Sequence, residues 1–85
     1  MTIFHDTLLA HGFTQVRAGF YTRLLSPQAG GPLFCTTGED GRPRKLLLWQ
    51  AQRVLLQGDV VTLAALEQVL ARVLQREANA AQRRA

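Results

Sequence analysis

The sequence predicts an α+β fold with a short N-terminal helix, an antiparallel β-meander of three to five strands, and a long C-terminal helix packed on the sheet. Three observations predict it. Apolar residues recur at helical spacing near both ends, they alternate with period two in between, and Asp40-Gly41 is a strong hairpin signal between two apolar runs. At 85 residues the chain is expected to be a single domain, residues 1–85, of which residues 75–85 form a polar helical tail.

The first element is a short helix over residues 3–11. Thr2 is a suitable N-cap, and Phe4 and Leu8 lie four positions apart, so they share one face of the helix. Gly12 then follows the helix at a position where a left-handed conformation costs glycine nothing. The residue after it is expected to fold back on Leu8.

Residues 13–25 alternate with period two, which is typical of strands. One bent strand would satisfy the pattern. Residues 17–19, Arg-Ala-Gly, could instead form a tight turn that makes residues 14–16 and 20–25 a hairpin. We favour the hairpin.

The middle of the chain contains further strand signals. Residues 26–32 carry two prolines and two adjacent glycines, so they are expected to form an irregular and mobile loop. Residues 33–37 and 44–50 then pair across the Asp40-Gly41 turn, and residues 53–57 form one more short strand. The result is a meander.

The C-terminal helix has the clearest pattern. Thr62 is a suitable N-cap, and after Leu74 the chain becomes polar and rich in alanine. We therefore expect one apolar stripe to cover the sheet and the remaining residues to project as a solvated or fraying helix. The stripe consists of Leu63, Leu66, Val69, Leu70, Val73 and Leu74.

Composition limits the classes of protein to consider. The apolar fraction of 47% and the net charge of +4 suit a globular, basic domain. The single cysteine excludes an intrachain disulfide, the first residues lack the pattern of a secretory signal, and no apolar run approaches the roughly 20 residues that span a bilayer. We expect a cytoplasmic protein that does not enter a membrane.

Few residues could carry catalysis or bind a metal. His5 and His11 are six positions apart, roughly 240° around a helix, so they do not share a face. Cys35 lies in an expected strand, where a buried thiol behaves as a small apolar group. A reactive thiolate would need a nearby charge, for example from Arg44 or Lys45 on the paired strand. We expect no enzyme activity, no metal and no cofactor.

Cations gather around the Asp40-Gly41 hairpin. Arg42, Arg44 and Lys45 lie within four residues, and Arg53 is expected to come alongside on the next strand. Glu39 and Asp40 partly neutralise this group. Three interpretations follow: solvated ion pairs, a phosphate-binding patch, or a surface for a protein partner.

The apolar run at residues 46–49 adds a second clue. Leu47 and Trp49 point to the side opposite their neighbours, and Tyr21 and Leu25 are expected to join them on an exposed face. Exposed aromatic patches of this kind mark interfaces. The alternative is a central strand buried on both faces, with the first helix on one side and the last helix on the other.

These features predict a non-catalytic protein-binding module of the adaptor or inhibitor type, such as small phage or mobile-element genes encode. A homodimer is one expected form. The expected partner-binding residues are Tyr21, Arg23, Arg42, Arg44, Lys45, Leu47, Trp49 and Arg53. The alternative is a nucleic-acid-binding protein that contacts phosphates, without reading bases, through Arg42, Arg44, Lys45 and Arg53.

Overall fold

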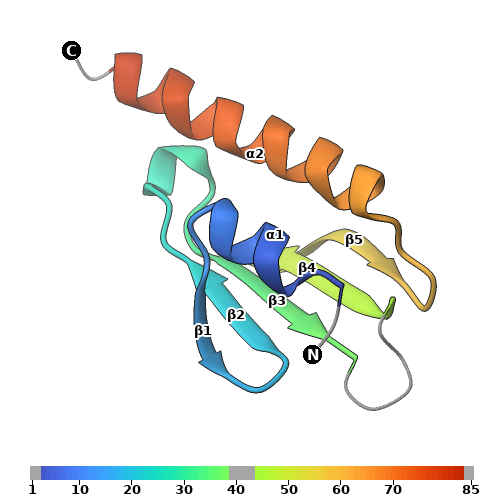
Figure 1. The fold of residues 1–85 in the computed structure, drawn as a ribbon. Helices are drawn as coiled ribbons and strands as arrows, with labels where there is room; N and C mark the ends of the chain where they lie inside the picture. Colours follow the sequence, from blue (N-terminus) through green and yellow to red (C-terminus); the bar gives the residue numbers. More distant parts are fainter. Residues whose placement is uncertain (1–2, 39–43, 84–85) are drawn as a thin grey trace.

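The computed structural model describes residues 3–38 and 44–83, with side chains as far as residue 79. The predicted fold class is confirmed, because two helices and one antiparallel sheet follow in the expected order (Figure 1). The elements are α1 (His5–Ala10), β1 (Thr14–Arg17), β2 (Phe20–Arg23), the 3-10 helix η1 (Pro27–Ala29), β3 (Leu33–Thr37), β4 (Leu46–Gln50), β5 (Arg53–Gly58) and α2 (Leu63–Arg83).

The sheet is a five-stranded meander in which each strand pairs with the next along the chain. The hairpin that we favoured for residues 13–25 is present as β1 and β2, and the single bent strand is wrong. The turn between them includes Gly19 at φ +74°, a conformation that suits glycine. Strands β3 and β4 pair as expected, whereas the Asp40-Gly41 turn itself lies outside the described residues.

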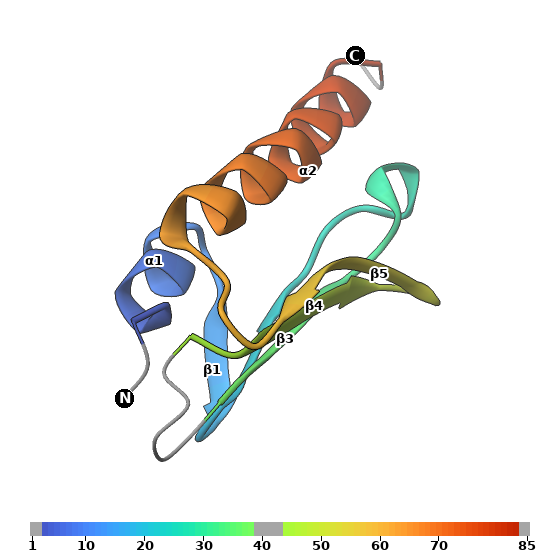
Figure 2. The ribbon, with the colours of Figure 1, turned by 90° about the vertical axis from the view of Figure 1, so that its right-hand side faces the viewer.

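Both helices lie on the same side of the sheet (Figure 2). The alternative in which one helix covers each face is therefore wrong. Apolar residues from the helices and from one face of the strands form a single core between them. Its fully buried members are Phe4 and Leu8 near and on α1, Tyr21, Leu33, Cys35, Leu46 and Leu48 on the sheet, and Leu66, Leu70 and Val73 on α2.

Helix α1 is shorter than expected and ends as expected. It begins at His5, with Phe4 at the N-cap and no side-chain cap, while Thr2 lies outside the described residues. Gly12 has φ +86°, and the amide of Phe13 donates a hydrogen bond of 3.0 Å to the carbonyl oxygen of Leu8. This is the left-handed helix ending predicted from Gly12.

Helix α2 begins where the sequence predicts. The hydroxyl of Thr62 accepts a hydrogen bond of 3.1 Å from the amide of Ala65, which satisfies one free donor of the first turn. Most of the apolar stripe is buried or half-buried against the sheet. Leu63 is the exception, since it remains 37% exposed at the start of the helix.

The loop before β3 is held in place from two sides. The buried side chain of Gln50 donates hydrogen bonds of 2.9 Å to the carbonyl oxygens of Ala29 and Gly31. On the other side, Oε2 of Glu77 accepts hydrogen bonds of 3.0 Å from the amide and the hydroxyl of Ser26. The loop expected to be irregular and mobile thus contains η1 and is anchored to both β4 and α2.

Candidate functional site

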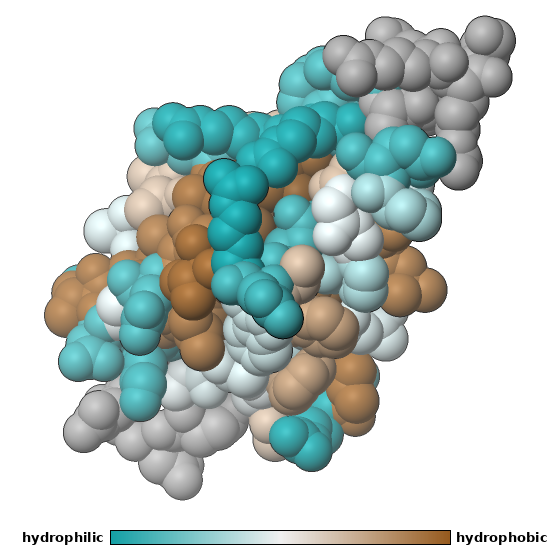
Figure 3. All heavy atoms as spheres, turned by 180° about the vertical axis from the view of Figure 1, so that it is seen from behind, coloured by the Kyte–Doolittle hydropathy of each residue, from teal (hydrophilic) through white to brown (hydrophobic). Residues whose placement is uncertain are grey.

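One face of the sheet is covered by neither helix. Side chains alternate along the strands, so Tyr21 and Cys35 point to the helices while Phe20 and Phe34 point away from them. Figure 3 shows the molecule from this side, with hydrophobic atoms exposed among hydrophilic ones. We call this surface the open face. Its central side chains are those of Phe20, Thr22, Phe34, Thr36, Leu47, Trp49 and Gln57.

Three aromatic rings form a cluster on the open face. The rings of Phe34 and Trp49 are stacked, with centroids 5.5 Å apart and an interplanar angle of 25°. Phe20 meets both rings edge to face, at 6.3 Å from Phe34 and 6.2 Å from Trp49. The guanidinium carbon of Arg17 lies 5.1 Å from the centroid of Phe20, within the range of a cation–π contact. All three rings are half-buried.

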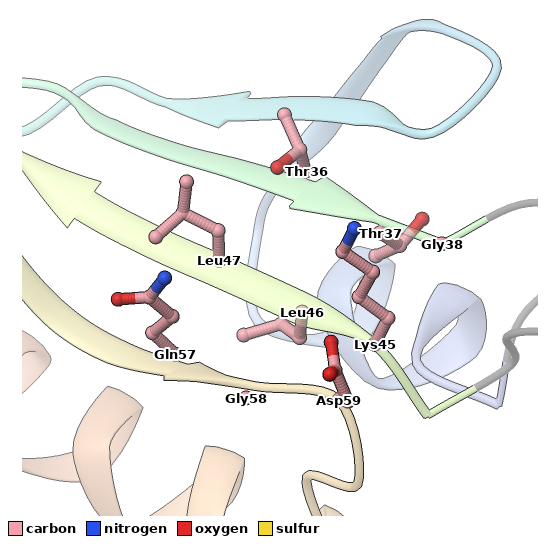
Figure 4. Close-up of a pocket in the computed structure, with 9 residues that line it drawn as sticks. All are labelled: Thr36, Thr37, Gly38, Lys45, Leu46, Leu47, Gln57, Gly58 and Asp59. Atoms are coloured by element: carbon pink, nitrogen blue, oxygen red, sulfur yellow. The ribbon is translucent and has the colours of Figure 1, made fainter.

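A hollow of about 800 Å³ lies beside this cluster (Figure 4). Thr36, Leu47 and Gln57 stand next to one another on its floor, because they are register partners on β3, β4 and β5. Lys45 and Asp59 line the same end of the hollow, and both lie to the right of Leu46 in Figure 4. The hollow therefore combines a floor of one apolar and two polar side chains with one cation and one anion.

Leu47 and Trp49 lie where the sequence predicts, half-buried on the side away from the helices. The prediction that Tyr21 and Leu25 join them is wrong. Tyr21 is 2% exposed and Leu25 is 9% exposed, and both belong to the core. The cause is the register, since Tyr21 pairs with Cys35 and shares its face.

Tyr21 is moreover held by α1. Nδ1 of His5 lies 2.7 Å from the hydroxyl oxygen of Tyr21 in a hydrogen bond, and the two rings meet edge to face at 5.8 Å. Burying a tyrosine requires such a partner for its hydroxyl. Tyr21 therefore connects the first helix to the sheet and is not accessible to a partner.

Arg23 also points to the helices rather than to the open face. It pairs with Leu33, a core residue, and a Cβ atom at Gly12 would lie 2.7 Å from its Nε atom. One of its terminal nitrogens is buried without a hydrogen-bond partner among the described residues. Arg23 is half-buried, and its guanidinium lies beside Gly12 at the end of α1 rather than on the open face.

Among the described basic residues, Arg53 does not form a compact patch with Arg44 and Lys45. Arg42 lies outside the described residues, and Arg44 and Lys45 are exposed just before β4. Arg53, in contrast, pairs with Gln50 at the other end of β4. Gln50 is five positions along the chain from Lys45, about 17 Å at 3.4 Å per residue. The expectation that Arg53 comes alongside the hairpin is wrong, because antiparallel pairing places it at the far end.

The thiol of Cys35 is on the helix side of the sheet and fully buried. Burial raises its pKa from 9.0 to about 12, so the thiol keeps its proton at neutral pH. Its predicted burial as a small apolar group is confirmed. Within residues 3–38 and 44–83, no three His, Cys, Asp or Glu side chains gather as a metal site would require. No helix in the same ranges is long and apolar enough to cross a membrane.

Phe20, Phe34 and Arg17 are not among the residues that the sequence predicts at a binding surface. The period-two alternation of residues 13–25 already places Phe20 on the other face of the strand from Tyr21, so the sequence contained a signal for Phe20. The contact of Phe34 with Trp49 depends on the register of β3 against β4. That register depends on the length of the turn between the two strands, which the sequence alone does not establish. No protein-family model, curated protein or solved structure matches this chain.

Proposed function

We propose that this chain is a non-catalytic protein-binding module, of the adaptor or inhibitor type, that contacts its partner through the open face. The observation that carries the proposal is the stacked pair of Phe34 and Trp49, with Phe20 against both, on a face that neither helix covers. Aromatic residues, and tryptophan above all, supply much of the binding energy at protein interfaces.

The cluster is already ordered before a partner arrives. Each ring is attached to a different paired strand and contacts the other two rings, so few side-chain rotamers remain to be lost on binding. Immobilising a flexible side chain at an interface costs about 0.5–1.5 kcal/mol. A preorganised cluster avoids most of this cost, which favours a binding role.

The charge of the open face suits a protein surface better than a phosphate chain. Its described charged side chains are Arg17 beside Phe20, and Lys45 and Asp59 at the end of the hollow. Arg53, one of the four residues expected to contact nucleic acid, lies at the far end of β4 from the other described cations of that group. We therefore rank a protein partner above nucleic acid.

The sheet sets the extent of the face. Five strands about 4.8 Å apart, each about five residues long, give a flat footprint of roughly 24 Å by 17 Å. We infer a complex with a protein surface that is apolar and carries few charges. A second copy of this chain is the first such surface to test.

The test uses Trp49, the only tryptophan of the chain, as its probe. Thr36→Glu places a charge in the middle of the open face, and Gln68→Glu places the same charge on an exposed position of α2 as a control. We expect the Trp49 emission of the wild-type chain to shift to shorter wavelength as its concentration rises, together with dimer formation in sedimentation equilibrium. Thr36→Glu should weaken the association at least about tenfold, whereas Gln68→Glu should not.

Two results would count against the proposal. One is a chain that stays monomeric and whose binding to every partner captured from cells is the same for Thr36→Glu and Gln68→Glu. The other is binding of an oligonucleotide at 50 mM salt that quenches Trp49 and weakens steeply as salt is added. The second result would establish the nucleic-acid alternative, because phosphate contacts release counterions.

A further inference from the structure

A second surface lies between the edge of the sheet and the last helix. A groove of about 180 Å³ is lined by residues of β5 and of α2. At about 30 Å³ per water molecule, this volume corresponds to roughly six waters, enough for one side chain of a ligand. The lining residues are Arg53, Val54, Leu55, Val69, Arg72, Val73 and Arg76.

Three of the seven lining residues are arginines. Arg72 and Arg76 are four positions apart on α2 and so lie on the same side of the helix. Arg53 comes from the first position of β5, where the β4–β5 turn ends. All three are exposed, and no carboxylate lines the groove with them.

The positive charge of the groove is not neutralised within the part of the chain whose side chains are described. No hydrogen bond or ion pair joins the three guanidinium groups to that part of the protein. The neighbouring carboxylate, that of Glu77, accepts hydrogen bonds from the amide and the hydroxyl of Ser26 instead. Three unpaired cations at one groove repel one another, and an anionic ligand would relieve that repulsion.

The remaining lining residues are aliphatic. Val73 is 1% exposed, and Leu55 and Val69 are half-buried and pack against the core. The register shifts in β5 between Val54 and Leu56, so Leu55 is an extra residue in the strand. No aromatic ring lines the groove, so it offers nothing on which a nucleic-acid base could stack.

The outer edge of β5 is free along the described chain. β5 is the last strand of the sheet, and Figure 2 shows its edge facing the viewer, with α2 to one side and no element in front. A ligand can therefore reach the groove along the strand. The bulge at Leu55 interrupts regular backbone pairing, so side-chain contacts must supply most of the specificity.

We propose that this groove binds an acidic, extended segment of a protein partner. Carboxylates of the segment pair with the guanidinium groups of Arg53, Arg72 and Arg76, and one aliphatic side chain enters between Leu55 and Val69. Guanidinium groups bind carboxylates in a bidentate geometry, which suits this ligand. The inference does not depend on the open face, because the three arginines and Val69 that carry it are not part of the aromatic cluster. Val54, which pairs with Trp49, borders both surfaces.

The experiment measures binding of a fluorescein-labelled peptide in which leucines alternate with glutamates, by fluorescence anisotropy at 50 mM salt. The paired substitutions Arg72→Gln and Arg76→Gln remove two charges from the groove. The matched control, Ala10→Glu with Gln15→Glu, lowers the net charge by the same two units at exposed positions of α1 and of β1, the strand at the opposite edge of the sheet from β5. We expect the groove variant to bind at least about twentyfold more weakly and the control to change less than about threefold.

Methyl chemical shifts supply a second readout that does not depend on the charge variants. On titration with the same peptide, the methyl signals of Leu55 and Val69 should shift, while those of Leu47 on the open face should not. Three results would overturn the proposal. They are no binding by the wild-type chain, an equal loss in the groove variant and its control, and tighter binding of a single-stranded oligonucleotide through the same arginines.

Discussion

The backbone amide and the hydroxyl of Ser26 both donate hydrogen bonds of 3.0 Å to Oε2 of Glu77, 51 residues further along the chain. Ser26 precedes η1, and Glu77 lies in the last third of α2. This contact fixes the second half of the helix over the loop, at a place where the apolar stripe of the helix has already ended. It also leaves Arg76 beside the groove without Glu77 as an ion-pair partner.

Replacing Glu77 should loosen this end of the molecule. Glu77→Ala removes the acceptor of two charge-assisted hydrogen bonds, and because Glu77 is half-buried we expect the free energy of unfolding to fall by about 1–2 kcal/mol. Urea denaturation measures it. Glu67→Ala, at an exposed position of the same helix, is the control and should change stability by less than about 0.5 kcal/mol. Equal effects of the two substitutions would contradict the role given to Ser26.

Two adjacent glycines should respond differently to alanine. Gly30 has φ +101°, and a Cβ atom there would lie 2.7 Å from the side-chain amide carbon of Gln50. Gly31 has φ +85°, but a Cβ atom there meets no atom within 4 Å. We expect Gly31→Ala to cost about 1–2 kcal/mol for the backbone conformation alone, and Gly30→Ala to cost at least about 1 kcal/mol more.

Thermal unfolding of the two glycine variants provides the comparison. Gln50→Ala with Gly30→Ala is informative as well, because removing the Gln50 side chain should remove the steric part of the Gly30→Ala effect. The interpretation fails if Gly31→Ala is the more damaging of the two single substitutions.

Cys35 should make stability depend on pH in the alkaline range. Its pKa is raised to about 12 by burial, so above pH 9.0, the value it is raised from, the unfolded chain loses a proton that the folded chain keeps. The unfolded state then binds fewer protons, and the free energy of unfolding falls by up to about 1.4 kcal/mol per pH unit until the folded-state pKa is reached. Below pH 9.0 this contribution is constant.

Urea denaturation between about pH 8 and pH 10.5 tests this, with Cys35→Ala as the comparison. The variant should show a shallower decline than the wild-type chain over that range. Parallel declines would mean that other groups, and not the buried thiol, cause the alkaline loss of stability.

The aromatic cluster should contribute to stability as well as to binding. In a double-mutant cycle, Phe34→Leu and Trp49→Leu should show a coupling free energy of about 0.5–1.5 kcal/mol, as expected for stacked rings. Phe34→Leu with Leu56→Ala, on opposite faces of the sheet, is the control and should be additive. A coupling near zero for Phe34 and Trp49 would show that their stacking adds nothing beyond burial.

Local signals gave much of the architecture. Gly12 marks the end of α1, Thr62 marks the start of α2, and the spacing of Leu66, Leu70 and Val73 gives the buried stripe of that helix. These features depend on interactions within a few residues, such as caps and left-handed turns, so the order of the residues is enough to predict them. The same holds for the alternation of side chains along the strands.

The sequence by itself determined which residues share a face, but only the tertiary structure decided which face is buried. The alternation of side chains allows Tyr21 to face either the helices or solvent. It is buried because α1 and α2 both pack on its side of the sheet. Arg53 lines the same groove as Arg72 and Arg76 only because antiparallel pairing and helix packing bring β5 beside α2. Such contacts depend on register and on the packing of distant elements, and these follow from the burial of the whole core rather than from any local pattern.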